Sequence, residues 1–557
     1  MATEIRGSAR KDGRFGVKEE RERSYWGWGY ADQVLPEKLL ARFQGTLQMA
    51  LGLDALRHRE PLALSALRLR VPRFALPPSL RDICTEETPE RARHSYGKAF
   101  RDVVRGLYGQ FDNPPDYVAY PRSEADIERL FAFCGASNVA LIPFGGGSSV
   151  VGGVEPPRTA GYAGAISCDM RFFDRVIRVD RESRTATIQA GIYGPALEAA
   201  LKPHGLTLRH FPQSFEFSTL GGWIATRSGG HYATVQTHID EFVQSVRMVT
   251  PKGVLETRAL PGSGAGPEPS RWVIGSEGIF GILTEATMRL QDIPQHRSKS
   301  TVSFASENAG FAAVRQISQS GLSPANCRLI SSMEAFSMGA GDGSETILLL
   351  GFESHDHPQQ QRLERALAIC AHHDGSPKAL QGRALDDEEG DASERWKQSF
   401  LLAPYLRDAM LCCGILLETF ETAVTWDRFA AFHQAVIAAA TDALQVHCGG
   451  GLITWRFTHV YPDGPAPYYS VVAPAREGQE VEQWDAIKSA VSDAILAYGG
   501  TITHHHAVGK DHRPWYTQQI SPLFGEILHQ AKRSLDPAWI LNPEVLLPPD
   551  PPHPKRS

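Results

Sequence analysis

The stretch Pro143-Phe144-Gly145-Gly146-Gly147-Ser148-Ser149 follows an apolar run, 139–142, that has the composition of a buried strand. Glycine has no Cβ and tolerates unusual dihedral angles, so three glycines let the backbone come very close to a ligand. Consecutive backbone N–H groups in such a turn form a concave anion site, and serine hydroxyls add donors without bulk. The stretch therefore indicates phosphate binding, with a plain turn after a strand as the alternative.

The residues before this turn predict a compact α/β unit. Ser123 and Asp126 have the spacing of a capping box, and apolar residues recur at helical intervals from Ile127 to Cys134. A short strand is expected over 116–120. The order strand, helix, strand and glycine turn puts the anion site at a strand end, where open α/β sheets usually bind ligands. The turn matches neither the P-loop pattern nor G-x-G-x-x-G opening a helix, so neither a nucleotide triphosphatase nor an ordinary Rossmann site is indicated.

Two further clusters of small residues follow, at 212–230 and 274–282. Three such clusters along the chain imply a long ligand that several loops hold. In this order, with Gly275-Ser276-Glu277-Gly278 leading into 282–286, they resemble the FAD-binding domain of the vanillyl-alcohol-oxidase flavoprotein superfamily. Within it the chain is most similar to the alkyldihydroxyacetonephosphate synthase family of ether-lipid synthesis. The more specific matching stretches are Trp26-Gly27-Trp28-Gly29-Tyr30, Ser323-Pro324-Ala325-Asn326-Cys327-Arg328-Leu329, Glu418-Thr419-Phe420-Glu421-Thr422 and Thr503-His504-His505-His506-Ala507-Val508-Gly509-Lys510.

The resemblance implies an α+β fold with a two-subdomain FAD-binding domain of the vanillyl-alcohol-oxidase type and an α+β cap. We divide the chain into a helical N-terminal region (1–110), the FAD-binding domain (111–293), the cap or substrate domain (294–500) and a C-terminal segment (501–557) that brings the histidine cluster to the active site. A chain of 557 residues is long enough for several domains and needs no disulfides to stabilise its core.

The resemblance also implies which residues hold FAD, with the first group at its pyrophosphate. The predicted cofactor residues are Pro143, Phe144, Gly145, Gly146, Gly147, Ser148, Ser149, Gln213, Ser214, Phe215, Glu216, Phe217, Ser218, Thr219, Thr226, Arg227, Ser228, Gly229, Glu277, Gly278, Ile279, Phe280, Gly281 and Ile282. No histidine or cysteine lies within 143–154, so we expect the flavin to be bound without a covalent link.

The activity that the resemblance implies is an exchange without net oxidation. The acyl chain of acyl-dihydroxyacetone phosphate is replaced by a fatty alcohol: a proton leaves the carbon that bears the ester, flavin N5 captures that carbon, fatty acid departs and the alcohol adds. The family's catalytic tyrosine corresponds to Tyr468, and its triple histidine to His504, His505 and His506. A phenol has an ordinary pKa near 10, so it acts as a base only where cations or hydrogen bonds favour its anion.

Each of these residues also has a structural interpretation. Tyr468 could be a packed aromatic residue, and the histidines could be a metal site or hydrogen-bonded packing; we expect no metal. Arg328, Arg456 and His210 match substrate-binding positions of the family. The two arginines lie in uncharged surroundings, which favours a phosphate or carboxylate partner, with a buried salt bridge as the alternative.

The same ambiguity holds for two other positions. His210 could be a surface turn residue, and Lys510 could either neutralise phosphate or cap a turn.

The family's glycine after the histidines is Ala507 here, and a second tyrosine position is Ser470. These departures leave substrate choice less well defined than flavin binding.

Composition and charge describe an ordinary globular protein. The net charge is −6, the charged fraction is 22%, and no basic stripe indicates nucleic acid. The eight cysteines include no C-x-x-C pair, no apolar run is long enough to span a membrane, and the chain ends in Pro554-Lys555-Arg556-Ser557 instead of a peroxisomal tripeptide. We therefore expect a bacterial-type, cytoplasmic protein. The resemblance implies a homodimer that acts on acyl-dihydroxyacetone phosphate and fatty alcohol, and peripheral contact at the inner membrane face is left open.

Two alternatives remain at this point. An FAD-linked 2-hydroxy-acid dehydrogenase or oxidase of the same superfamily would carry a motif resembling His506-Ala507-Val508-Gly509, often with a metal. A catalytically silent flavin-binding or lipid-binding protein is the other, although a candidate base, two arginines and three histidines argue against it.

Overall fold

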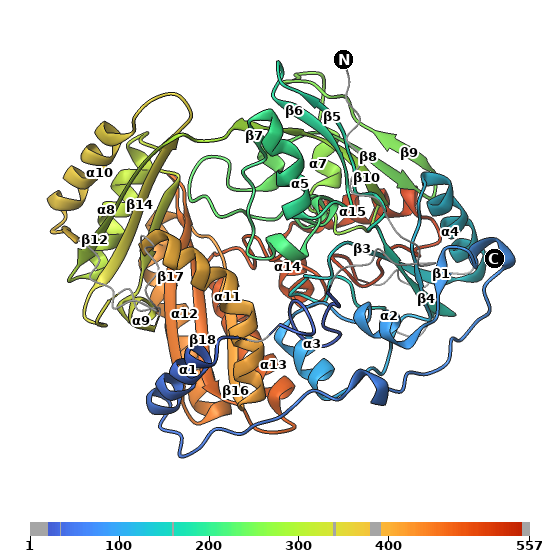
Figure 1. The fold of residues 1–557 in the computed structure, drawn as a ribbon, viewed down its shortest axis with the longest axis horizontal. Helices are drawn as coiled ribbons and strands as arrows, with labels where there is room; N and C mark the ends of the chain where they lie inside the picture. Colours follow the sequence, from blue (N-terminus) through green and yellow to red (C-terminus); the bar gives the residue numbers. More distant parts are fainter. Residues whose placement is uncertain (1–20, 34, 159–160, 338–340, 379–391, 549–557) are drawn as a thin grey trace.

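The computed structural model describes residues 21–33, 35–158, 161–337, 341–378 and 392–548, and the side chains of 378–401 lie outside that description. Two bodies lie side by side in Figure 1, one built around two small sheets and the other around a single large sheet. The prediction of an α+β fold with a two-subdomain cofactor domain and a cap is confirmed.

The first subdomain has a four-stranded sheet. Its strands, in spatial order, are β1 (Cys84–Thr85), β2 (Tyr117–Ala119), β4 (Gly164–Asp169) and β3 (Val139–Phe144). β2 and β3 both run parallel to β4, and α4 (Glu124–Ser137) connects them. Ser123 and Asp126 form the predicted capping box at the start of α4, and Asn138 ends it with a left-handed φ of 52°. The predicted order of strand, helix, strand and glycine turn is therefore confirmed.

The second subdomain is an antiparallel sheet. Its strands, in order, are β5 (Val176–Asp180), β6 (Thr185–Gln189), β10 (Ile282–Arg289), β8 (Val243–Thr250) and β9 (Gly253–Glu256). The helices α5 (Gly194–Leu201), α6 (Leu220–Thr226) and α7 (Ser270–Val273) and the strand pair β7 (Leu206–Thr207) and β11 (Gln291–Asp292) accompany it. Thr219 caps α6 by accepting the Gly222 N–H at 3.3 Å. The start of α6 and the loop before β10 thereby face the first subdomain.

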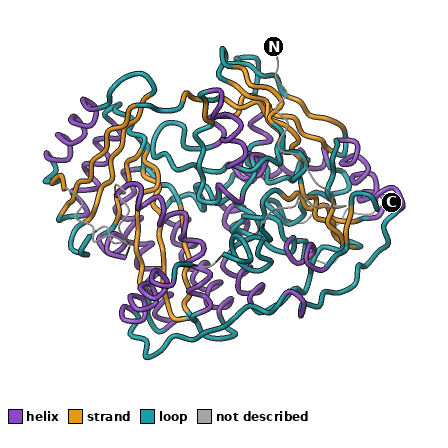
Figure 2. The backbone as a smooth tube through the Cα atoms, in the orientation of Figure 1, coloured by secondary structure: helices purple, strands orange, loops and turns teal. Residues whose placement is uncertain are grey.

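The cap is a seven-stranded antiparallel sheet with helices packed on it. Its strands, in order, are β15 (Ser376–Lys378), β12 (His296–Phe304), β14 (Thr346–Ser354), β13 (Asn326–Ile330), β17 (Leu452–Val460), β18 (Pro465–Pro474) and β16 (Ile415–Glu421). Its helices are α8 (Glu307–Gln319), α9 (Ser332–Ser337), α10 (Gln360–His372), α11 (Ala392–Cys412), α12 (Trp426–Cys448) and α13 (Glu480–Ala497). In the backbone trace of Figure 2 the strands of the cap are orange and its helices are purple.

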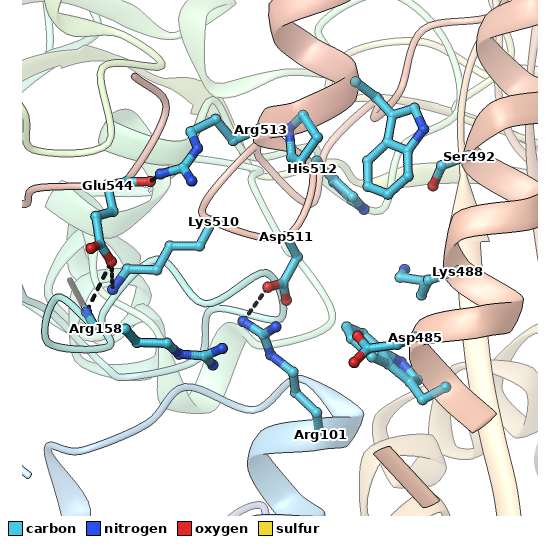
Figure 3. Close-up of a pocket in the computed structure, with 13 residues that line it drawn as sticks. Arg101, Arg158, Asp485, Lys488, Ser492, Lys510, Asp511, His512, Arg513 and Glu544 are labelled. Atoms are coloured by element: carbon cyan, nitrogen blue, oxygen red, sulfur yellow. Dashed lines mark hydrogen bonds and ion pairs between the residues drawn. The ribbon is translucent and has the colours of Figure 1, made fainter. Parts of the chain in front are cut away.

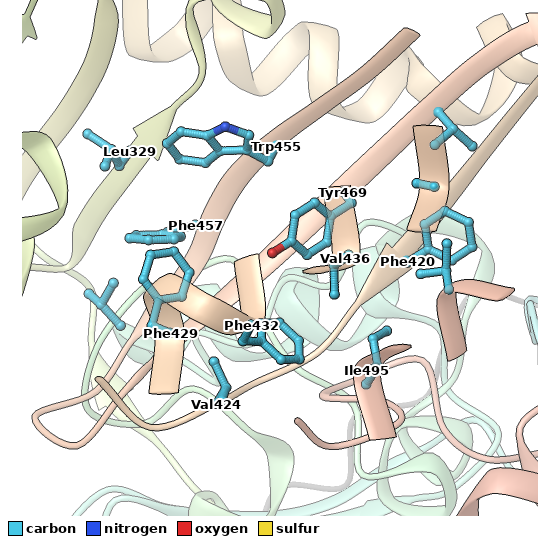
Figure 4. Packing of buried hydrophobic residues seen from close by; sticks show 14 of the residues in the cluster. Leu329, Phe420, Val424, Phe429, Phe432, Val436, Trp455, Phe457, Tyr469 and Ile495 are labelled. Carbon is cyan, nitrogen blue, oxygen red and sulfur yellow. The ribbon is translucent and has the colours of Figure 1, made fainter. Parts of the chain in front are cut away.

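Aromatic side chains fill the space between α12 and the central strands of the cap (Figure 4). Phe429 and Phe432 from α12 are buried, as are Phe457 from β17 and Tyr469 from β18. His433 Nδ1 lies 3.0 Å from Tyr469 Oη, so a buried polar pair is satisfied inside this apolar core. This packing holds β18 in place, and β18 also carries Tyr468 on its other face.

The two ends of the described chain both contact the cofactor domain, and the N-terminal region also contacts the cap. The N-terminal region contributes α1 (Glu37–Ala50), which packs on α11, and α2 (Thr88–Arg93) and α3 (Phe100–Leu107). After α14 (Arg513–Gln519) and α15 (Pro522–Leu535), Leu541 pairs in parallel with Leu141 of β3. Lys532, fully buried, bonds the carboxylate of Asp536 at 2.6 Å and two backbone carbonyls at 2.7 Å each, so its three protons are satisfied. None of the described helices has the length and apolar character needed to cross a membrane.

Replacing Phe432 by alanine should leave a cavity in the cap core. We expect Phe432→Ala to lower the free energy of unfolding by about 3–5 kcal/mol, because a fully buried phenyl ring is lost. Val446→Ala on the same helix removes a side chain that is 70% exposed and should change it by less than about 0.5 kcal/mol. Urea unfolding followed by circular dichroism measures both, and equal losses in the two variants would contradict the packing described.

Candidate functional site

The glycine turn after β3 packs directly against the segment that precedes α6. A Cβ atom at Gly146 would lie 1.8 Å from the Phe217 carbonyl oxygen, and one at Gly145 would lie 2.4 Å from Thr219 Oγ1. Atoms cannot approach so closely, so these positions require glycine. Gly147 has a φ of 69°, a left-handed conformation that glycine adopts without strain. The two subdomains therefore meet at this turn.

A cavity lies between the two subdomains, lined mostly by small or apolar residues. The predicted cofactor residues that line it are Pro143, Phe144, Gly145, Ser149, Thr219, Thr226, Glu277, Gly278, Gly281 and Ile282. The sequence prediction missed Gly153, Val154, Met170, Ala190, Gly221, Gly222, Ala225, Met248, Ser276, Leu283 and Asn542. Only a few of the missed residues belong to the small-residue clusters. The others come from strand ends and from the C-terminal segment, where no local pattern marks them.

A second cavity shares the glycine turn, and basic side chains surround it. Gly146, Gly147, Ser148 and Phe217 line it together with Arg23, Arg93, Lys98 and Arg171. Burial lowers the pKa of Lys98 to about 8. Asp169, in the same lining, is held by Arg171 at 2.7 Å and by His94 at 2.9 Å. Four basic side chains and a backbone turn rich in N–H groups suit an anion such as a pyrophosphate.

Together the two cavities fit FAD. The cavity between the subdomains is mostly apolar and can accept a ring system, and the cationic cavity beside it can accept the pyrophosphate. The remaining predicted cofactor residues line neither cavity: Gln213, Ser214, Phe215, Glu216, Ser218, Arg227, Ser228, Gly229, Ile279 and Phe280. Ile279 and Phe280 are buried in the subdomain core, and Phe215 stacks on Trp223 with ring centroids 6.2 Å apart. Contact of these residues with FAD stays a prediction.

Two buried glutamates hold the irregular segment that carries the three histidines. Glu421, at the end of β16, accepts the backbone N–H groups of His504 (2.6 Å), His505 (2.9 Å) and His506 (2.9 Å). Burial alone would raise the pKa of Glu421, but the adjacent histidines, His505 first, hold that pKa well below its usual range. Glu277, in the cofactor domain, accepts the N–H groups of residues 508 and 509 at 2.9 and 2.8 Å. The segment is therefore attached to both domains.

Tyr468 faces this histidine segment. Its ring stacks on that of His505 with centroids 6.1 Å apart, and meets the ring of His506 edge-on at 5.7 Å. The guanidinium of Arg456 lies 4.1 Å from the ring centroid. Burial raises the pKa of Tyr468, and the charge of Arg456 is the strongest influence opposing that rise. The structure thus brings the predicted tyrosine, two of the predicted histidines and one predicted arginine together.

The two predicted arginines differ in their partners. Arg456 forms a buried ion pair with Glu334 of α9, so the salt-bridge alternative holds for it, although its charge also faces Tyr468. Arg328 is 2% exposed and donates to the His231 carbonyl oxygen at 2.5 Å. Burial, and after it the charge of Arg456, lower the pKa of Arg328 to about 9. An anion bound next to Arg328 would therefore stabilise its charged form.

His210 lies inside the cofactor domain and not on a surface turn. It is 1% exposed, its Nε2 lies 3.3 Å from Ser228 Oγ, and burial lowers its pKa to about 3. A Cβ at Gly230 would touch His210, whereas one at the neighbouring Gly229 would touch His505. The short segment 228–230 thus separates His210 from the histidine cluster, and its role in substrate binding stays a prediction.

Three imidazoles come close enough to be considered as metal ligands. His459, His504 and His505 each offer a nitrogen, and these atoms lie within 4.8 Å of one another. However, both nitrogens of His459 already have partners, Thr458 Oγ1 at 3.1 Å and the Gly230 carbonyl oxygen at 3.0 Å. Hydrogen bonding therefore accounts for the contacts of His459, in agreement with the hydrogen-bonded packing that we considered as a structural alternative for the histidines.

A third cavity lies where 510–515 faces α3 and α13 (Figure 3). Asp511 is buried there beside Arg101, with which it forms an ion pair. Burial raises the pKa of Asp511 to about 7, against the influence of Arg101. Lys510 pairs with Glu544 at 3.3 Å. Lys510 also donates to the Pro156 carbonyl oxygen at 2.9 Å, so it attaches the C-terminal segment to the cofactor domain, a structural role like the alternative considered for it.

A Cβ at Gly146 should prevent the turn from meeting residue 217. We expect Gly146→Ala to lose most of its bound flavin or to fold poorly, because the clash is with backbone and not with a flexible side chain. Gly135→Ala, where the nearest atom would be an alanine Cβ at 3.9 Å, is the matched control and should keep its flavin. The ratio of flavin to protein absorbance after desalting measures retention. Full flavin retention by Gly146→Ala would contradict the proposed role of the turn.

Comparisons with known proteins agree with this arrangement. The model of the FAD binding domain matches residues 115–258, and that of the C-terminal domain of FAD linked oxidases matches residues 293–546. A D-lactate dehydrogenase [cytochrome] of Arabidopsis thaliana is 26% identical over 487 residues, 84% of this chain and 79% of the relative.

A closer relative is the alkyldihydroxyacetonephosphate synthase of Dictyostelium discoideum, which is 32% identical over 505 residues, covering 85% of this chain and 79% of its own length. A solved structure of an alkyldihydroxyacetonephosphate synthase superposes with a TM-score of 0.77 at 27% identity, covering 94% of this chain and 98% of that one. The chain belongs to the alkyldihydroxyacetonephosphate synthase family of FAD-linked oxidases.

Proposed function

We propose that this protein is an FAD-dependent alkyl transferase that exchanges the acyl chain of acyl-dihydroxyacetone phosphate for a fatty alcohol, without net oxidation. The observation that carries the proposal is the grouping of Tyr468 with Arg456, His505 and His506 where the cap meets the cofactor domain. Family membership supports it, since the relative from Dictyostelium discoideum bears the name of this activity.

Tyr468 is the proposed base that removes the proton from the carbon bearing the ester. Its phenol must first lose its own proton to solvent, and because burial raises its pKa, the resulting anion must be stabilised before it can take the proton from carbon. The guanidinium of Arg456 against its ring supplies positive charge for this purpose. Tyr468 returns the proton to the same carbon after the exchange.

Arg328 is the proposed partner of the substrate phosphate. Its guanidinium is buried and its pKa is lowered, so a doubly charged phosphate would stabilise it and be bound by its planar fork. When bound, FAD would supply an electron-poor ring that accepts the carbon after its proton has left. The residues around the glycine turn would hold it, and we propose non-covalent binding, because the turn contains no histidine or cysteine.

A 2-hydroxy-acid dehydrogenase is the second candidate. The close imidazoles of His459, His504 and His505 could bind a hydroxy acid through a metal, but only if that metal displaced a hydrogen bond of His459. Sequence similarity to the D-lactate dehydrogenase is lower than to the synthase. The two candidates differ in what they do to the flavin, which makes them separable.

Anaerobic flavin spectra separate the two activities. We expect palmitoyl-dihydroxyacetone phosphate to bleach the flavin and release fatty acid, and a fatty alcohol to restore the colour. Bleaching by a 2-hydroxy acid alone, restored only by an electron acceptor, would replace the synthase proposal by the dehydrogenase.

Removing the phenol oxygen of Tyr468 should remove the base. We expect Tyr468→Phe to lower the rate of fatty acid release by about 10²–10⁴-fold while flavin content is kept. Tyr469→Phe is the matched control, since Tyr469 is the next residue of β18 and bonds His433 in the cap core. It should lose some stability and keep a rate within about tenfold of the original. A Tyr468→Phe enzyme as fast as its control would rule out the phenol as the base.

A further inference from the structure

The Glu421 carboxylate touches a histidine side chain as well as the backbone. His505 Nδ1 lies 3.2 Å from Glu421 Oε2, and the same Nδ1 lies 3.0 Å from His504 Nδ1. His506 Nδ1 is farther, at 3.7 Å. An ionised carboxylate can only accept hydrogen bonds, so His505 Nδ1 carries a proton. His504 Nδ1 is then the acceptor of that pair, because two N–H groups would repel each other.

The direction of donation continues from His504 to His238. Burial lowers the pKa of both rings, so each is neutral, and His504 carries its proton on Nε2. That N–H donates to Tyr461 Oη at 2.7 Å, the Tyr461 hydroxyl donates to Thr237 Oγ1 at 2.9 Å, and Thr237 donates to His238 Nδ1 at 3.0 Å. His238 Nε2 then donates to the His504 carbonyl oxygen at 2.8 Å. The carbonyl acceptor at one end fixes this direction, and the single Nδ1–H of His505 is shared between His504 Nδ1 at 3.0 Å and Glu421 Oε2 at 3.2 Å.

His505 Nε2 is the ring nitrogen that this network leaves available. Among the rings of His238, His459, His504 and His505, Nε2 of His505 is the nitrogen without a hydrogen-bond partner in the part of the chain that the structure describes. The His505 ring stacks on Tyr468 with an interplanar angle of 20°, so it borders the proposed base. As the Nδ1–H tautomer, His505 presents a lone pair at Nε2.

We propose that Glu421 is a positioning residue that holds His505 as its Nδ1–H tautomer, so that Nε2 accepts the hydroxyl proton of the incoming alcohol. This inference rests on the proposed exchange reaction. There Tyr468 takes up and returns the proton on carbon, and the alcohol loses its own proton as its oxygen bonds to that carbon. His505 Nε2 takes this second proton, and the imidazolium charge lies beside Glu421. The fatty acid leaves as a carboxylate, so the second proton passes to solvent and the reaction balances.

The two half-reactions test the proposal. In His505→Gln, palmitoyl-dihydroxyacetone phosphate should still release fatty acid at a rate within about tenfold of the original enzyme, because Tyr468 is intact. Incorporation of radiolabelled hexadecanol should fall by about 10²–10⁴-fold. Glu421→Gln should likewise keep fatty acid release and lose alcohol incorporation. Glu421→Asp keeps an ionised acceptor, so its alcohol incorporation should be at least tenfold faster than that of Glu421→Gln. Equal losses in both half-reactions would overturn the proposal, as would normal alcohol incorporation in His505→Gln.

A second measurement does not depend on turnover, so it tests the proposal even if the Glu421→Gln variant folds poorly. In the holoenzyme labelled with ¹⁵N-histidine, the His505 signals are those that disappear in His505→Gln. We expect them to report a protonated Nδ1 and an unprotonated Nε2. The opposite tautomer would overturn the inference, whereas the proposed function fails separately if the original enzyme releases no fatty acid at all.

Two control variants show whether the effects are specific to Glu421 and His505. Tyr461→Phe removes the acceptor of His504 Nε2 and leaves Glu421 and His505 in contact, so alcohol incorporation should change by less than about tenfold. Glu353→Gln removes a carboxylate of the cap that pairs with Arg209 of the cofactor domain and should leave both half-reactions unchanged. Flavin content and circular dichroism of every variant establish that it is folded.

Discussion

The site depends on two buried carboxylates that hold one irregular segment between two domains. Backbone N–H groups that are buried without partners cost free energy, and an irregular segment has no strand or helix to supply them. Glu421 supplies acceptors for residues 504–506 from the end of a cap strand, and Glu277 supplies them for residues 508 and 509 from the cofactor domain. The histidines therefore take their positions from both domains, and a shift of either domain would move them relative to Tyr468.

Close backbone contacts also arrange the cofactor site. The glycine turn lies so close to the segment 217–219 that side chains are excluded from it, and this contact brings the two subdomains together. Small residues then leave room for a ring system on one part of the turn, while Arg23, Arg93, Lys98 and Arg171 gather around the other. The positive charge thus lies at one part of this short turn and the room for a ring system at another, as an extended dinucleotide requires.

Much of the fold follows from local signals. The capping box at Ser123, the apolar run into β3 and the glycine turn are all read from neighbouring residues, and the structure has each of them. Local signals were weaker for the site. Arg456 lies in an uncharged stretch, and its partner Glu334 is distant in sequence, so the sequence could not distinguish a salt bridge from an open anion site. His210 appears beside a proline-containing turn, but the structure buries it behind 228–230.

The sequence by itself determined the α/β unit that presents the glycine turn, because neighbouring residues encode it, and its family resemblance indicated the cofactor class and the candidate tyrosine and histidines. Only the tertiary structure decided how these groups act on one another. Glu421 and His505 are separated by many residues in the chain, yet they touch, and the hydrogen-bond direction among His505, His504 and His238 depends on that contact. The physical reason is that a tautomer is set by the partners of both ring nitrogens, and folding alone brings those partners together.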